Sequence, residues 1–141
     1  MLPVFVLDAS VTTAWAVADE DDPYSNLVLE AMVQHRVLVP ALWLWEVGNS
    51  LVMAERRGRL TNEETAKFLA TLRDISIKVE PEPTALFLEE MVALARLHQL
   101  SVYDAAYLHL AMYHGCPLAT TDAALRQAAG RAGVPLFGVH D

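Results

Sequence analysis

Short apolar runs that alternate with helix-length segments constrain this chain more than any other feature of its sequence. Residues 4–7 form a run with no polar side chain, which is typical of a parallel strand buried on both faces. Further strands are expected at 37–39, 75–79, 117–120 and, at the edge of the sheet, 136–139. Because helical segments separate these runs, the sequence predicts a three-layer α/β/α fold around a central, mainly parallel sheet of four to five strands.

Capping signals indicate where the helices begin. Ser10 is a typical N-cap, and Thr61 with Glu64 forms the pattern of a capping box. Pro40 fits the first turn of a helix, because the amide hydrogen that it lacks has no helical partner there. The expected helices cover residues 11–17, 24–34, 41–57, 61–74, 84–99, 101–114 and 123–131.

Length and composition bound the class of protein. The chain has 141 residues with no linker or internal repeat, so we expect a single domain over residues 1–141. A hydrophobic content of 54% excludes intrinsic disorder. The formal net charge of −8 argues against a general nucleic-acid coat, since phosphate binding needs an excess of positive charge.

Cysteine content and the N-terminal sequence indicate the compartment. Cys116 is the only cysteine, which excludes an intrachain disulfide and a cysteine-rich zinc site and fits a reducing environment. No basic segment of the signal-peptide type precedes Asp8, and no apolar run approaches the ~18–20 residues of a membrane span. We therefore expect a cytoplasmic protein with no membrane association.

Four acidic residues carry the functional interpretation. Asp8 directly follows the first strand and Asp122 closely follows the fourth, so both are expected at the sheet edge where ligands bind. Asp104 lies near a helix start, and Glu46 lies in an apolar helical stretch where an unpartnered carboxylate is costly to bury. Converging carboxylates without matching basic residues repel one another and need protons or cations. Oxygen ligands without thiols suit Mg²⁺ or Mn²⁺.

Each of these acids also has a plain structural interpretation. Asp8 and Asp122 could cap the helices that follow them. Asp104 could complete a capping box with Ser101, and Glu46 could point to solvent on a polar helix face. A convergence of all four at one place would favour the cation site over these alternatives.

Four segments together form a recognisable pattern. They read V-F-V-L-D-A-S at 4–10, E-V-G-N-S-L at 46–51, L-S-V-Y-D-A-A-Y at 100–107 and L-A-T-T-D at 118–122. In this order and at this spacing they resemble the PIN-domain family, and more specifically the VapC-type toxin ribonucleases of type II toxin–antitoxin systems. The resemblance spans essentially the whole chain. It implies a Mg²⁺- or Mn²⁺-dependent endoribonuclease that hydrolyses RNA phosphodiester bonds.

The resemblance also implies roles and partners. The catalytic residues and metal ligands would be Asp8, Glu46, Asp104 and Asp122. Supporting polar residues would be Ser10, Asn49 and either Thr120 or Thr121. The implied partners are an RNA substrate, a cognate VapB-type antitoxin and a second copy of the chain in a homodimer.

Basic and aromatic residues are open to two interpretations. Arg56, Arg57 and Arg59 could bind RNA phosphates, or they could form a solvated helix end in which the first two complement the helix dipole. Four aromatic side chains are more typical of core or interface positions than of base stacking, although at least one of the two tryptophans in the helix expected at 41–57 should face a groove. These aromatic residues are Trp15, Trp43, Trp45 and Tyr103.

Other functional classes fit the sequence less well. The histidines lack the H-E-x-x-H spacing and are interpreted as surface or packing residues, and the acidic run at 19–22 as a solvated loop. A receiver-type signalling domain would need paired acids after the first strand and a lysine near the C-terminus, and a phosphatase of the haloacid dehalogenase type would need D-x-D where Asp8 is followed by Ala9 and Ser10. A catalytically silent PIN-like binding module remains as the alternative.

Overall fold

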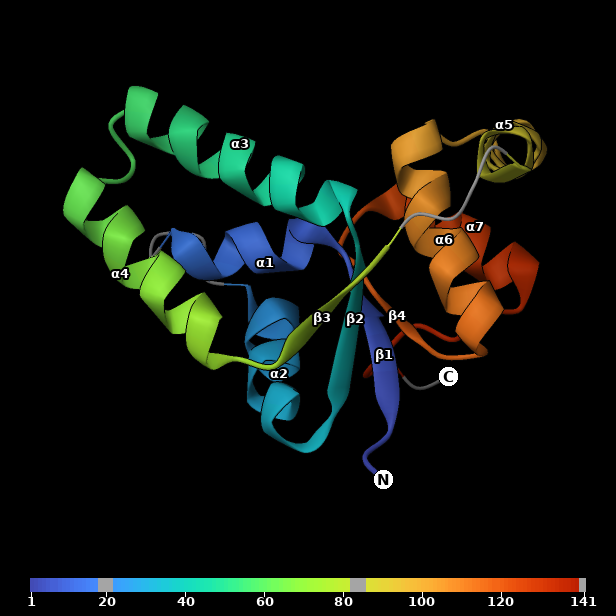
Figure 1. Ribbon diagram of the computed structural model, residues 1–141, viewed down its shortest axis with the longest axis horizontal. Coiled ribbons are helices and arrows are strands. Elements are labelled where there is room, and N and C mark those ends of the chain that lie inside the picture. Colours follow the sequence, from blue (N-terminus) through green and yellow to red (C-terminus); the bar gives the residue numbers. More distant parts are fainter. Residues whose placement is uncertain (18–21, 82–85, 140–141) are drawn as a thin grey trace.

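A four-stranded parallel sheet with the order β3-β2-β1-β4 runs through the middle of the molecule (Figure 1). The computed structural model describes residues 1–17, 22–81 and 86–139. The strands in these ranges are β1 (Val4–Leu7), β2 (Arg36–Pro40), β3 (Ile77–Glu80) and β4 (Leu118–Ala119). The helices are α1 (Ala9–Ala16), α2 (Pro23–Ala31), the 3₁₀ turn η1 (Met32–Gln34), α3 (Leu42–Arg56), α4 (Asn62–Asp74), α5 (Leu86–His98), α6 (Val102–His114) and α7 (Ala123–Ala132).

Helices cover both faces of this sheet. In Figure 1, α1 to α4 lie on one side and α5 to α7 on the other, with the strands between them. Helix α6 packs against β1 and β2, while α3 packs against β2 and α1. The predicted α/β class and the parallel sheet between helical layers are confirmed.

The apolar run of β1 explains why this strand is central. Phe5, Val6 and Leu7 are fully buried, because helices cover both faces of the sheet at this strand. Val6 pairs with Leu38 of β2 on one side and with Leu118 of β4 on the other. The core is therefore built around the strand whose end carries Asp8.

Several predicted boundaries are wrong for identifiable reasons. Ser10 does not cap α1, because the helix begins at Ala9, two residues earlier than expected, and Asp8 occupies the N-cap position without a side-chain capping bond. Pro40 ends β2 instead of opening α3, since it stands at the end of the ladder, where a missing amide hydrogen costs little. The expected strand at 136–139 is reduced, within the described residues, to one bridge between Leu136 and Leu118. The predicted helix 24–34 ends at Ala31 and continues as a 3₁₀ turn.

Two of the predicted capping interactions are present. Thr61 and Glu64 form both bonds of the capping box at the start of α4, with distances of 3.1 and 3.0 Å. At the start of α6, Ser101 Oγ accepts the Asp104 N–H at 3.1 Å. The expected helix start at residue 84 and part of the acidic run at 19–22 lie outside the described residues. No helix in the described ranges is long and apolar enough to cross a membrane.

Candidate active site

The carboxyl ends of β1 and β4 bring the first and last predicted site segments together. Leu7 pairs with Ala119, and the Asp8 N–H donates to the Ala119 carbonyl at 2.9 Å. The residues that follow both strands therefore leave the sheet at the same edge, as expected for parallel neighbours. Asp8 is 5% exposed and Thr120 is fully buried at this position.

Two hydroxyl groups hold one oxygen of the buried Asp8 carboxylate. Ser10 Oγ donates to Asp8 Oδ2 at 2.6 Å, and Thr120 Oγ1 donates to the same oxygen at 2.7 Å. Thr121 contributes differently, because its backbone N–H donates to Ser10 Oγ at 3.2 Å while its side chain is exposed. The structure thus places Thr120, and not the Thr121 side chain, against Asp8.

Asp122 combines a capping role with a place near the other acids. Its Oδ2 accepts the Leu125 N–H at 2.9 Å, so it is the N-cap of α7. Its own N–H donates to Thr120 Oγ1 at 3.0 Å, which ties the start of α7 to the residue that holds Asp8. The capping interpretation therefore holds for Asp122, and its negative charge still acts on the neighbouring carboxylates Asp8 and Asp104.

Glu46 points toward α6 and not to open solvent. Its Oε1 accepts a hydrogen bond of 2.6 Å from the hydroxyl of Tyr107, which is fully buried. Sequence reasoning assigned no role to Tyr107, although it ends the segment L-S-V-Y-D-A-A-Y. Its spacing of three residues from Asp104 was the available signal, since positions i and i+3 share one helix face.

The pKa values of the acids show that they act on one another. Burial raises the pKa of Asp104 to about 6, with further contributions from the charges of Asp122, Asp8 and Glu46. Burial also raises the pKa of Asp8, which Asp122 reinforces and the two hydroxyl bonds oppose. The pKa of Glu46 is raised by burial and by Asp8, and lowered by its hydrogen bond from Tyr107. The four acids therefore form one electrostatic cluster.

The donor chemistry of this cluster suits a hard divalent cation. Its side chains offer oxygen atoms only, and none of the ion pairs within the described residues involves these four carboxylates. Mutual repulsion in a partly buried site is what a bound cation would relieve. Within the described ranges, however, no group of three or more His, Cys, Asp or Glu side chains is arranged to hold a metal ion. A bound ion would have to draw the carboxylates together.

The remaining predicted residues lie outside this cluster. Asn49 is exposed on α3 and lines a cavity of about 300 Å³ between α1 and α3. Arg57 and Arg59 line the same cavity, so two of the three predicted basic residues share one hollow with Asn49. Arg56 is exposed, and its guanidinium lies 3.9 Å from the sulfur of Met53.

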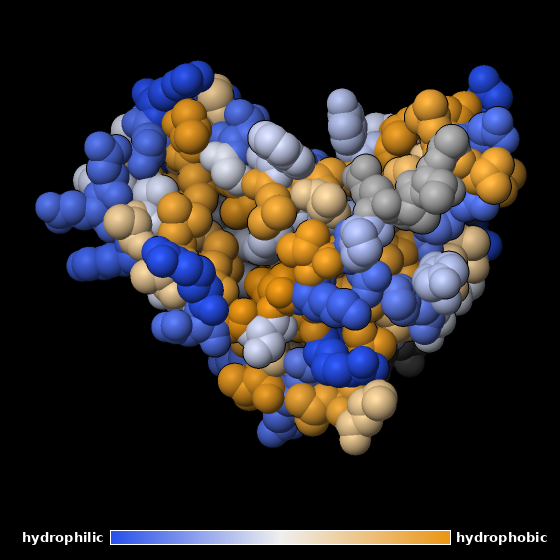
Figure 2. All heavy atoms as spheres, in the orientation of Figure 1, coloured by the Kyte–Doolittle hydropathy of each residue, from blue (hydrophilic) through white to orange (hydrophobic). Residues whose placement is uncertain are grey.

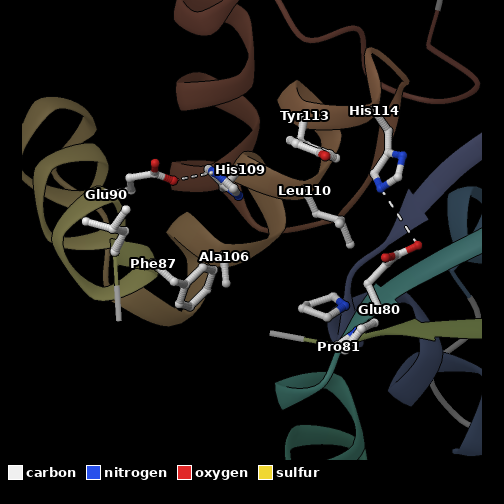
Figure 3. Close-up of a pocket in the computed structure, with 11 residues that line it drawn as sticks. Glu80, Pro81, Phe87, Glu90, Ala106, His109, Leu110, Tyr113 and His114 are labelled. Carbon is white, nitrogen blue, oxygen red and sulfur yellow. Dashed lines mark ion pairs between the residues drawn. The ribbon is translucent and has the colours of Figure 1, made fainter. Parts of the chain in front are cut away.

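A second hollow, of about 510 Å³, lies between the end of β3 and helices α5 and α6 (Figure 3). It is lined largely by apolar and aromatic side chains, and none of the four site acids is among its lining residues. His109 pairs with Glu90 at 3.2 Å and His114 with Glu80 at 3.8 Å. These two histidines take part in side-chain packing and pairing, in line with the sequence interpretation.

Similarity to known proteins identifies the family of this chain. The PIN domain family matches residues 5–131. The protein named Ribonuclease VapC3 from Pyrobaculum aerophilum is 33% identical over 123 residues, which cover 86% of this chain and 92% of that relative. The crystal structure of PAE2754 from Pyrobaculum aerophilum has a TM-score of 0.70 at 25% identity, covering 100% of this chain and 90% of that one. The crystal structure of FitAcB from Neisseria gonorrhoeae shares the fold, with a TM-score of 0.63 at 17% identity and coverage of 95% and 96%. The chain therefore belongs to the PIN-domain family.

Proposed function

We propose that this chain is a metal-dependent endoribonuclease and the toxin of a toxin–antitoxin pair. One observation carries the proposal: Asp8, Glu46, Asp104 and Asp122 come from four separate elements and form a single electrostatic cluster at the sheet edge. The similarity to the relative named Ribonuclease VapC3 supports RNA as the substrate. We further propose a VapB-type antitoxin and a second copy of the chain as partners, and the cytoplasm as the compartment.

The residues of the cluster have separable roles in this proposal. Asp8, Glu46, Asp104 and Asp122 would hold Mg²⁺ or Mn²⁺, which when bound activates a water molecule and stabilises charge on the phosphate oxygens. Two hydroxyl groups fix the orientation of Asp8, and Tyr107 fixes that of Glu46.

Asp104 holds its proton more tightly than an ordinary aspartate. With its pKa raised to about 6, a fraction of its carboxyl groups carries the proton near neutral pH until a cation replaces it. Cation binding by this residue is therefore expected to strengthen as the pH rises through this range.

The test is cleavage of RNA by the purified protein under defined metal conditions. Mg²⁺ or Mn²⁺ should support cleavage that excess EDTA abolishes, Ca²⁺ should substitute poorly, and the products should carry 5′-phosphate and 3′-hydroxyl ends. Asp8→Asn should be inactive, and Glu30→Gln, on the exposed face of α2, should behave as the wild type. Cleavage that persists in EDTA would refute the metal mechanism. A folded protein that cleaves no RNA with either metal would favour the catalytically silent binding module.

A further inference from the structure

Arg126 on α7 binds the residue that holds Asp8. Its Nε donates to the Thr120 carbonyl at 2.7 Å, while the Thr120 hydroxyl donates to Asp8 Oδ2, also at 2.7 Å. Thr120 is fully buried and follows the last residue of β4, so its carbonyl lies beyond the end of that strand. A buried carbonyl without a partner costs free energy, and the arginine supplies the partner. Thr120 is therefore fixed at two points, by Asp8 through its side chain and by Arg126 through its backbone.

Tyr24 on α2 holds the guanidinium group of Arg126 in place. The central carbon of the guanidinium lies 4.5 Å from the centre of the Tyr24 ring, which is a cation–π contact. The Tyr24 hydroxyl donates to the Phe137 carbonyl at 2.7 Å, so the ring is itself anchored. Burial raises the pKa of Tyr24, and the charge of Arg126 and a backbone hydrogen bond from Thr120 oppose that rise. Tyr24 thus contacts both the arginine and the threonine that the arginine binds.

Arg126 does not neutralise the acid that precedes it on α7. It lies one turn after Asp122, a spacing at which opposite charges commonly pair on a helix. Among the described residues, however, no ion pair joins these two side chains. Asp122 Oδ2 instead accepts the Leu125 N–H, and the guanidinium binds Thr120 and Tyr24. The arginine therefore acts on the site through a hydrogen bond and leaves the charge of Asp122 to a cation.

The arrangement of the elements makes α7 a support for the end of β4. Strands β1 and β4 end toward an edge of the molecule where Figure 2 shows the surface indented between α3 and α6, as these helices are located in Figure 1. Helix α7 packs against α6 and lies behind it in the same view. It contributes to the site from there through its N-cap Asp122 and through Arg126.

We propose that Arg126, held by Tyr24, is a positioning residue that fixes Thr120 and thereby the orientation in which Asp8 meets a divalent cation. The proposal rests on the proposed function, which assigns Asp8 to that cation. Arg126 contacts neither the cation nor the RNA, so its loss should weaken cation binding and lower kcat with little effect on the KM for RNA. A counter-ion role predicts the opposite sign, because removal of a positive charge near carboxylates would tighten cation binding.

Mn²⁺ binding to the full chain tests the proposal without catalysis, through the electron paramagnetic resonance signal of free Mn²⁺. Thr120→Val should raise the Mn²⁺ Kd about 10- to 100-fold, as expected for a residue that orients a metal ligand. Arg126→Met, one hydrogen bond further from the cation, should raise it roughly 3- to 10-fold. The double variant should bind Mn²⁺ within about twofold of Thr120→Val alone, because Arg126 acts through Thr120.

Arg131→Met is the matched control. Arg131 is also on α7, and its Nη2 donates to the His98 carbonyl at 3.1 Å, so the substitution removes the same charge and a similar bond away from the acids. Its Mn²⁺ Kd should stay within about twofold of the wild type. An increase in Kd equal to that of Arg126→Met would show a general loss of stability and would overturn the proposal.

Position 24 provides a second pair of variants, which decides the question if Arg126→Met does not fold. Tyr24→Phe keeps the ring against the guanidinium and should keep the Mn²⁺ Kd within about twofold of the wild type. Tyr24→Leu removes the ring and should raise the Kd in the same direction as Arg126→Met. Equal Kd values for the two variants would show that the ring does not hold the arginine and would contradict the role of Tyr24. Circular dichroism melts establish that each variant is folded.

The outcomes separate this proposal from the ribonuclease function. If the wild type cleaves RNA while Arg126→Met keeps or tightens the Mn²⁺ Kd, the positioning role fails and the enzyme stands. If the effects of Arg126→Met and Thr120→Val multiply in the double variant, Arg126 does not act through Thr120 and the proposal is overturned. If the Kd values follow the expected order but the wild type cleaves no RNA, the ribonuclease function fails and the positioning role stands.

Discussion

Asp104→Asn should make the metal-free protein more stable and less sensitive to pH. In the folded protein the pKa of Asp104 is raised from 3.8 to about 6, chiefly by burial and then by the charges of Asp122 and Asp8. The ionised carboxylate is therefore unfavourable in the folded state. Asparagine removes this charge and leaves the helix cap in place, because the bond to Ser101 Oγ comes from the backbone N–H of residue 104.

The size of the effect follows from the shift in pKa. A rise of roughly 2 units corresponds to about 3 kcal/mol of unfolding free energy, and solvent screening of this partly exposed group reduces it to about 1–2 kcal/mol. For a chain of this length that is about 3–8 °C in Tm. Folded and unfolded states are both protonated below pH 3.8, so the wild type should lose this stability as the pH rises from about 4 to about 6, and little more above that.

Thermal melts in EDTA from pH 4.5 to 7.5 test this reasoning. The Tm of the wild type should be higher at pH 4.5 than at pH 7.5, and this difference should be larger for the wild type than for Asp104→Asn. Glu30→Gln serves as the control for the general effect of removing one negative charge. At pH 7.5, Asp104→Asn should melt above the wild type. A variant that melts below the wild type at pH 7.5 in EDTA would show that Asp104 is not held unfavourably among the other acids.

Four further outcomes are expected. Mg²⁺ at ten to a hundred times its Kd should add about 1.4–2.7 kcal/mol to the unfolding free energy of the wild type, which corresponds to a rise of roughly 4–10 °C in Tm. The rise should be much smaller for Asp8→Asn, and equal rises would contradict Mg²⁺ binding by Asp8. Tyr107→Phe should lower the unfolding free energy in urea by about 1 kcal/mol and should also lower kcat, because Glu46 loses the hydrogen bond that fixes its position. An unchanged kcat would contradict the proposed role of Tyr107 in positioning Glu46. Thr120→Val should cost about 1–3 kcal/mol by urea unfolding, since the buried Thr120 hydroxyl makes two hydrogen bonds, to Asp8 and from the Asp122 N–H, that are lost, whereas Thr121→Val should cost under about 0.5 kcal/mol. Arg57→Gln should weaken RNA binding and reduce the slope of log K against log [salt] by about one, measured between 50 and 200 mM salt. An unchanged slope would show that Arg57 does not contact an RNA phosphate.

The elements that the sequence predicts well are those whose signals are local. The unbroken apolar run of β1 and the capping box at Thr61 depend on neighbouring residues, and both are present. The predicted helix starts at Ser10 and Pro40 were wrong because each residue type suits two neighbouring positions. Serine fits the N-cap or the first turn of a helix, and proline fits the end of a strand or the first turn of a helix. The pairing of strands and the packing of α3 against β2 and α1 decide between such positions, and these long-range contacts leave no local signal.

The sequence located the four acids that the structure brings together, but it located the groups that orient them less well. Strand ends and the four-segment resemblance located Asp8, Glu46, Asp104 and Asp122, and the structure brings their charges together. The choice of Thr120 over Thr121 needed the register of β4, because consecutive residues of an extended segment point to opposite sides. The role of Tyr107 depends on its contact with Glu46, which is 61 residues away in the chain. The spacing from Asp104 indicates which face of α6 carries Tyr107, but it does not indicate the partner on α3.

Strand β4 has a consequence for when the site comes into existence. It is only two residues long, yet it carries Thr120 and Asp122 to the side of β1, more than a hundred residues away in the chain. Synthesis proceeds from the N-terminus, so the strands β1 to β3 can pair before β4 has emerged. A chain that ends before residue 118 lacks Thr120 and keeps only Ser10 of the two residues whose hydroxyl groups bind Asp8. We expect such fragments to be without hydrolytic activity, because the proposed site is complete only when β4 is paired with β1.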